Sequence, residues 1–96
     1  MMAVNTSDLK SLCESFFLKQ GPGICVRSLI ADSSSYFTIE TLQGEIDSEE
    51  EDMEEDDVAF NRECIEAIQS NDFSLNYLAI VVEEGSDGSI IGIPRD

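Results

Sequence analysis

The chain has 96 residues, of which 21 are acidic and five are basic, so its formal net charge at pH 7 is −16. A chain of this length has room for a single domain with one hydrophobic core. Its charge excludes unaided binding to nucleic-acid backbones or anionic membrane surfaces, because both are polyanions.

The N-terminal part of the chain predicts an amphipathic helix. Its apolar residues recur at the i, i+3, i+4, i+7 and i+8 positions of one helical face: Leu9, Leu12, Cys13, Phe16 and Phe17. Thr6 or Ser7 can cap the start of this helix. The glycines and proline at 21–23 predict its end.

Two strands joined by a tight turn are predicted next. Residues 24–30 alternate between two faces, with Ile24 and Val26 on one side and Cys25 and Arg27 on the other. A polar turn at 32–35 leads into a second strand over 36–42. The short connection favours an antiparallel hairpin.

The negative charge is concentrated in one segment. Ten of the 13 residues from 45 to 57 are acidic: Glu45, Asp47, Glu49, Glu50, Glu51, Asp52, Glu54, Glu55, Asp56 and Asp57. No lysine or arginine lies between Arg27 and Arg62, so these acids have no counter-charge nearby in the sequence. The other 11 acids and the five bases leave the rest of the chain at only −6.

The conformation of this segment depends on two opposing effects. Ser48 followed by Glu51 has the form of a capping box, which favours a helix. Ten like-charge pairs at i,i+3 and i,i+4 oppose an isolated helix by roughly 2–5 kcal/mol in total. Repulsion is the larger effect, so we expect a mobile acidic loop over 45–57 that becomes helical near Asp56 or Asp57.

The C-terminal part predicts one more helix and two strands. A helical stripe is formed by Phe60, Cys64, Ala67 and Ile68, with Ile65 beside it. The run 75–82 is apolar on both faces, which suits a central strand covered on each side or a strand at an interface. After a turn at 83–88, Ile90, Ile91 and Ile93 can form a last strand that Pro94 ends.

These elements predict an α+β fold for a single domain spanning 1–96. The order is helix, strand, strand, helix, strand, strand. The simplest arrangement is a mainly antiparallel four-stranded sheet with both helices on one face. The other face would then be partly exposed and could serve as a binding surface or as a homodimer interface.

Motifs for catalysis, cofactors and metals are missing from the sequence. There is no histidine, and Cys13, Cys25 and Cys64 lack the spacing of metal ligands. We expect reduced thiols, with Cys13 and Cys64 in the core and Cys25 more exposed. We therefore expect no cofactor, no metal site and no enzymatic activity, in a cytoplasmic protein with no signal or membrane segment.

Function is predicted from the charge. In size and charge the chain is similar to phage inhibitors that imitate DNA, to immunity proteins that block nuclease toxins, and to small acidic secretion chaperones. This similarity is one of composition and transfers no residues. As a helix, the segment 45–57 would carry roughly one charge per 2 Å, close to the ≈ 1.7 Å of duplex DNA.

Two functions follow from these observations. The first is a non-catalytic inhibitor or regulator whose ten acids engage a basic protein, such as a nucleic-acid-binding enzyme or a toxin, by mimicking nucleic-acid charge. The alternative is a structural or adaptor subunit, or a small acidic chaperone, that binds through an apolar sheet face. In that case the acidic loop would serve only solubility.

Overall fold

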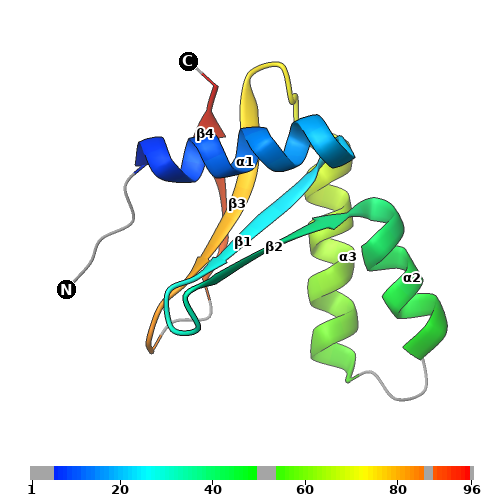
Figure 1. The fold of residues 1–96 in the computed structure, drawn as a ribbon. Helices are drawn as coiled ribbons and strands as arrows, with labels where there is room; N and C mark the ends of the chain where they lie inside the picture. The colour runs from blue at the N-terminus through cyan, green and yellow to red at the C-terminus, as the bar shows by residue number, and fades with distance from the viewer. Residues whose placement is uncertain (1–5, 50–53, 86–87, 96) are drawn as a thin grey trace.

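The structure is a computed structural model that describes residues 6–49, 54–85 and 88–95 (Figure 1). These residues form an α+β domain. Its elements in chain order are α1 (Thr6–Gln20), β1 (Gly23–Ser28), β2 (Ser33–Thr38), α2 (Ile39–Glu49), α3 (Glu55–Ser70), β3 (Asn76–Val82) and β4 (Ile90–Pro94).

The four strands form one mixed sheet in the order β2-β1-β3-β4. Both outer pairs, β1–β2 and β3–β4, are antiparallel hairpins, as predicted. The central pair is parallel, with Ile24 opposite Leu78 and Val26 opposite Ile80. The prediction of a mainly antiparallel sheet is therefore wrong at its centre. A parallel pair needs a long crossover connection, and β2, α2 and α3 together provide it.

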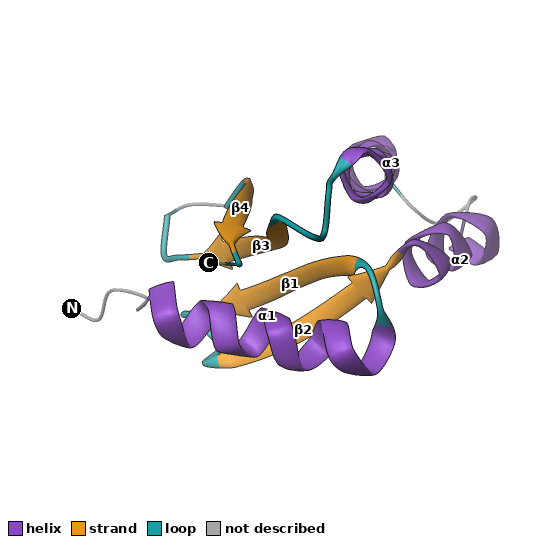
Figure 2. Ribbon diagram, turned by 90° about the horizontal axis from the view of Figure 1, so that it is seen from above, coloured by secondary structure: helices purple, strands orange, loops and turns teal. Residues whose placement is uncertain are grey.

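Helices cover the sheet on both faces, as Figure 2 shows from above. One core lies under α1 and contains Leu9, Cys13, Cys25, Tyr77, Ala79 and Ile93. The other lies under α2 and α3 and contains Ile24, Leu42, Cys64, Ile68, Leu78 and Ile80. The predicted placement of both helices on one face is wrong, whereas the prediction that the 75–82 strand is covered on each side is confirmed.

The two cores follow from the alternation of side chains along β1 and β3. Successive residues of each strand point to opposite faces, and each face carries buried apolar residues. This alternation places Cys25 in the core under α1, where it is fully buried. The expectation of a more exposed Cys25 is therefore wrong, and the buried positions of Cys13 and Cys64 are confirmed.

Helix α1 begins and ends close to its predicted limits. Gly21 follows it with a positive φ of 81°, and its N–H donates to the carbonyl of Phe17 at 2.8 Å. The hydroxyl of Tyr36 on β2 donates to the Gly21 carbonyl at 2.6 Å, and its ring stacks on Phe16 with 5.1 Å between centroids. These contacts hold the end of α1 against the sheet.

Helix α2 replaces part of the second predicted strand. That strand ends at Thr38, whose Oγ1 accepts a hydrogen bond from the N–H of Thr41 at 3.3 Å, as an N-cap does. Ile39, Leu42 and Ile46 then fall at i, i+3 and i+7 on one helical face, and Leu42 and Ile46 are buried. Their packing makes a helix of residues that also fit a strand pattern.

The predicted loop over 45–57 is accordingly wrong for residues 45–49, which belong to α2, while its mobility stays a prediction. Ser48 does not begin a helix. Its hydroxyl donates to the Gly44 carbonyl at 2.6 Å inside α2. Residues 50–53, which include the other half of the proposed capping box, lie outside the described residues. Helix α3 begins at Glu55, one residue from the predicted position.

None of the helices in the described ranges is long and apolar enough to cross a membrane.

Two glycines provide a test of the packing. A methyl group at the buried Gly23 would lie 2.6 Å from the Phe37 carbonyl oxygen and from the Tyr36 ring, whereas Gly44 in α2 has no atom within 4 Å of that position. We expect Gly23→Ala to lower the free energy of unfolding by about 1–3 kcal/mol through overpacking. We expect Gly44→Ala to raise it by about 0.5–1 kcal/mol, because alanine loses less backbone entropy in a helix.

Urea denaturation followed by circular dichroism measures both effects on the same scale. If Gly23→Ala left the free energy of unfolding unchanged, this result would contradict the close approach of the Tyr36 ring to β1.

Candidate functional site

Helices α2 and α3 form a hairpin, and the predicted acidic residues collect at one end of it. Figure 1 shows the two green helices side by side, with the end of α2 and the start of α3 both at the bottom. We call this region the acidic end and define it by six residues: Glu45, Asp47, Glu54, Glu55, Asp56 and Asp57. Glu49 also lies on α2. Glu50, Glu51 and Asp52 lie outside the described residues.

The helix dipoles act differently on the two sides of the acidic end. Glu55, Asp56 and Asp57 occupy the first turn of α3, where the positive end of the dipole favours negative charge. The last turns of α2 carry Asp47 and contain no basic residue, although the negative end of that dipole lies there. The carboxylates of α2 are therefore the less favourably placed, and a nearby cation would stabilise them most.

The basic residues do not neutralise the acidic end. Arg27 pairs with Asp32 at 2.8 Å, the one ion pair within the described ranges. The Arg95 guanidinium lies over the ring of Tyr77, 5.0 Å from its centroid, and donates to the Phe73 carbonyl at 2.6 Å. Lys10 and Lys19 lie on α1, and Arg62 lies further along α3.

Two carboxylates of the acidic end have neutral partners instead. The side-chain amide of Asn61 on α3 donates to Glu45 Oε2 at 3.1 Å, and that of Gln43 donates to Asp47 Oδ1 at 3.0 Å. Such amides satisfy a lone pair of the carboxylate and leave its charge in place. The acidic end is therefore not neutralised by any ion pair among the described residues.

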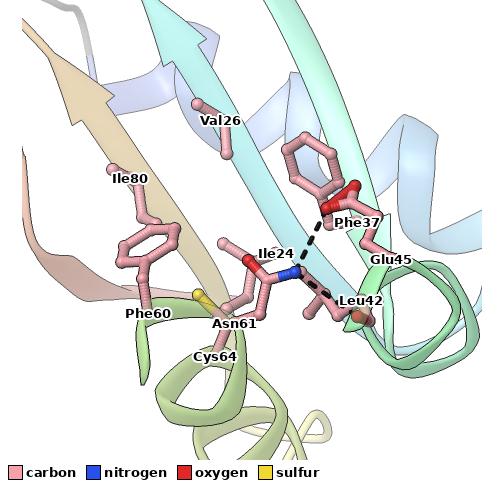
Figure 3. A pocket seen from close by; sticks show the side chains of 9 residues that line it. All are labelled: Ile24, Val26, Phe37, Leu42, Glu45, Phe60, Asn61, Cys64 and Ile80. Carbon is pink, nitrogen blue, oxygen red and sulfur yellow. Dashed lines mark hydrogen bonds between the residues drawn. The ribbon is translucent and has the colours of Figure 1, made fainter. Parts of the chain in front are cut away.

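A cavity of about 90 Å³ lies beside the acidic end, between α2, α3 and the sheet (Figure 3). Apolar side chains form most of its wall. The lining residues are Ile24, Val26, Phe37, Leu42, Glu45, Phe60, Asn61, Cys64 and Ile80. Glu45 is half-buried, so the charge of the acidic end reaches the wall of this cavity.

Asn61 is the one buried polar side chain in the described part of the chain, with 5% of its surface exposed. Besides Glu45, its Nδ2 reaches the Leu42 carbonyl oxygen at 3.3 Å, so this amide joins α3 to α2. Asn61 was not predicted from the sequence as a site residue. The available signal was a polar side chain on the apolar stripe of α3, three and seven residues before Cys64 and Ile68.

Two of the three thiols, those of Cys64 and Cys25, are unsuited to nucleophilic chemistry. Burial, helped by the charge of Glu63, raises the pKa of Cys64 to about 11. A hydrogen bond shared with Cys13, followed by burial, raises the pKa of Cys25 as well. A thiol is reactive as the thiolate, so these two groups are inert near neutral pH. Within the described ranges, no three acidic or thiol side chains are grouped as metal ligands.

Comparisons with known proteins place this chain in no family. No family model matches it, no curated protein matches it, and no solved structure matches it. Its function is therefore inferred from its own residues.

The pKa of Cys64 makes stability depend on pH. The unfolded chain loses this proton near the ordinary pKa of 9.0, and the folded protein holds it to about 11. The contribution is fully present below pH 9.0 and is lost as the pH rises towards 11. We expect this thiol to lower the free energy of unfolding by about 1.4 kcal/mol per pH unit in that window.

Urea denaturation at several pH values measures the slope. Cys64→Ala should have a lower free energy of unfolding at neutral pH. Between pH 9.0 and about 11, however, its free energy of unfolding should fall less steeply than that of the unsubstituted protein. A variant that kept the slope of the unsubstituted protein would contradict the assignment to Cys64.

Proposed function

We propose that this protein is a non-catalytic inhibitor or regulator that binds a basic surface of a protein partner through its acidic end. The observation that carries the proposal is the collection of six carboxylates, from α2 and from the N-cap and first turn of α3, at one end of the molecule. No cation is paired to them in the described part of the chain. The positive charges that would pair with these carboxylates must therefore come from another molecule.

The electrostatics of the hairpin favour such a partner. Like charges repel along α2 and α3, and the dipole of α2 adds to this repulsion at Asp47. A basic surface placed against the acidic end would relieve both effects. It would also be attracted from a distance, because long-range charge complementarity raises association rates at low salt.

The charge spacing supports a nucleic-acid-binding protein as the partner. Glu55, Asp56 and Asp57 follow one another on α3, so they carry one charge per about 1.5 Å of helix axis. This is close to the one charge per about 1.7 Å of duplex DNA. A surface that binds phosphates through lysines and arginines therefore meets a similar density of negative charge here. We place this encounter in the cytoplasm.

The alternative function has less support. An adaptor or small acidic chaperone that binds through an apolar sheet face needs such a face, as does a homodimer formed through the sheet. Helices cover both faces of the central strands. The large apolar side chains that remain exposed in the described ranges come from different elements and loops: Leu18, Ile30, Phe60, Leu75 and Ile91.

Two variants of equal charge test the proposal. The first replaces the six acids of the acidic end by their amides. The second does the same at six acids elsewhere: Glu14, Glu40, Glu63, Glu66, Glu83 and Glu84. If each contact contributes about 0.5 kcal/mol, the first variant should bind the partner about 100-fold more weakly. The second should bind nearly as well as the unsubstituted protein.

The partner is obtained by affinity capture from lysate of the source cells at about 50 mM salt, where charge interactions are strong, and is eluted by a salt gradient. Dissociation constants are then measured with the purified partner. The unsubstituted protein should also displace nucleic acid from it in a gel-shift assay. Equal affinity of both variants for the partner would count against the proposal. So would a partner that stays bound to the affinity matrix at about 500 mM salt.

A further inference from the structure

The cavity beside the acidic end contains an oxygen atom that lacks a hydrogen bond. Asn61 uses its Nδ2 for Leu42 and Glu45, and its Oδ1 accepts no hydrogen bond within the described part of the chain. Figure 3 shows this oxygen on the side of the amide turned away from Glu45, towards Ile24 and Phe60. Asn61 is 95% buried, so the oxygen belongs to the interior of the cavity.

This oxygen remains reachable from the cavity. Every fully enclosed side-chain nitrogen or oxygen in the described ranges has a hydrogen-bond partner. Since the Asn61 Oδ1 has none, it is not fully enclosed. It therefore offers an acceptor that the described residues leave unused to whatever enters the cavity.

We propose that the cavity receives the side chain of one lysine of the protein partner. The aliphatic stem would lie against Phe60 and Val26, and the ammonium group would donate hydrogen bonds to Asn61 Oδ1 and to the carboxylate of Glu45. The proposal rests on the proposed function, because it supplies that basic partner with an anchor residue beside the acidic end.

The size of the cavity fits the end of a lysine side chain. Cavities of about 150 Å³ take up benzene, which has six heavy atoms. By this proportion, about 90 Å³ holds roughly four heavy atoms. The terminal nitrogen and the three carbons next to it make four. The planar guanidinium of arginine carries five N–H donors, more than the cavity can satisfy.

The charges around the cavity favour a cation over an apolar anchor. Glu45 contributes a carboxylate that no cation of the described residues neutralises, and Asp47 lies two residues further on α2. An apolar side chain would leave Asn61 Oδ1 without a donor and would bury the Glu45 charge further. A lysine supplies both the missing donor and the missing charge.

Two peptides of equal charge test the proposal: acetylated octalysine, and the same octamer with every lysine ε-trimethylated. Trimethylation keeps the positive charge but removes the N–H donors and enlarges the head group. At low salt, calorimetry should give octalysine about tenfold tighter binding, the scale of a lost hydrogen bond to a charged group. Octalysine should also shift the methyl NMR signals of Ile24 and Ile80 inside the cavity.

Variants of the cavity provide the matched controls. Glu45→Gln keeps an acceptor for Asn61 and removes the charge, and should weaken octalysine binding about tenfold. Asp47→Asn removes the same charge from the exposed surface of α2, and should weaken binding less than about threefold. Val26→Met fills the cavity from its wall with a longer, flexible side chain and should abolish the preference for octalysine over its trimethylated form.

The outcomes separate this inference from the proposed function. Equal, salt-sensitive binding of both peptides with unchanged methyl signals would overturn the lysine pocket and leave the acidic end as a charge-only surface. Absence of binding by either peptide would count against both. Stronger methyl shifts with an octamer that carries one norleucine in place of a lysine would identify an apolar anchor, and would also overturn the inference.

Discussion

The parallel pairing of β1 with β3 is the constraint on which the rest of the structure depends. Both strands contribute buried apolar residues to both faces, so each face must be covered. Helix α1 covers one face before the sheet begins. The chain must then leave β1 and return parallel to it, and this crossover carries β2, α2 and α3. The acidic end lies where α2 finishes and α3 begins, at one end of the molecule.

Packing within the crossover explains how the acidic helices form. Repulsion among the carboxylates opposes helix formation, as expected from the sequence. Burial of Leu42 and Ile46 offsets this repulsion, since each buried side chain of this kind contributes about 1.5–3 kcal/mol. Asn61 adds a hydrogen-bonded link from α3 to α2. The acids of α2 are thus held in place by tertiary contacts and not by local preference.

The proposed function divides between two neighbouring features of this hairpin. The exposed carboxylates would provide the long-range attraction that governs the rate of encounter with the proposed basic partner. The cavity provides a partly desolvated site, where a single anchor residue can contribute more to affinity than many exposed contacts. The half-buried Glu45 belongs to both features, because its carboxylate forms part of the acidic end and of the cavity wall.

Much of the fold could be predicted from side-chain periodicity. Helices α1 and α3, both hairpins and the apolar faces of β1 and β3 follow local patterns, and the charge of the segment 45–57 is read directly from the sequence. Helix α2 was missed because Phe37, Ile39 and Leu42 fit the end of a strand, while Ile39, Leu42 and Ile46 fit a helix. The two patterns share residues, and only packing decides between them.

The sequence by itself determined the charge, the α+β class and the apolar faces of most elements. Only the tertiary structure decided the parallel centre of the sheet, the cover on each face and the cavity around Asn61. The physical reason is that periodicity shows which side of an element avoids water, but not which other element covers it. The cavity joins Ile24, Glu45 and Ile80, which are far apart in the chain and meet only after the crossover is complete.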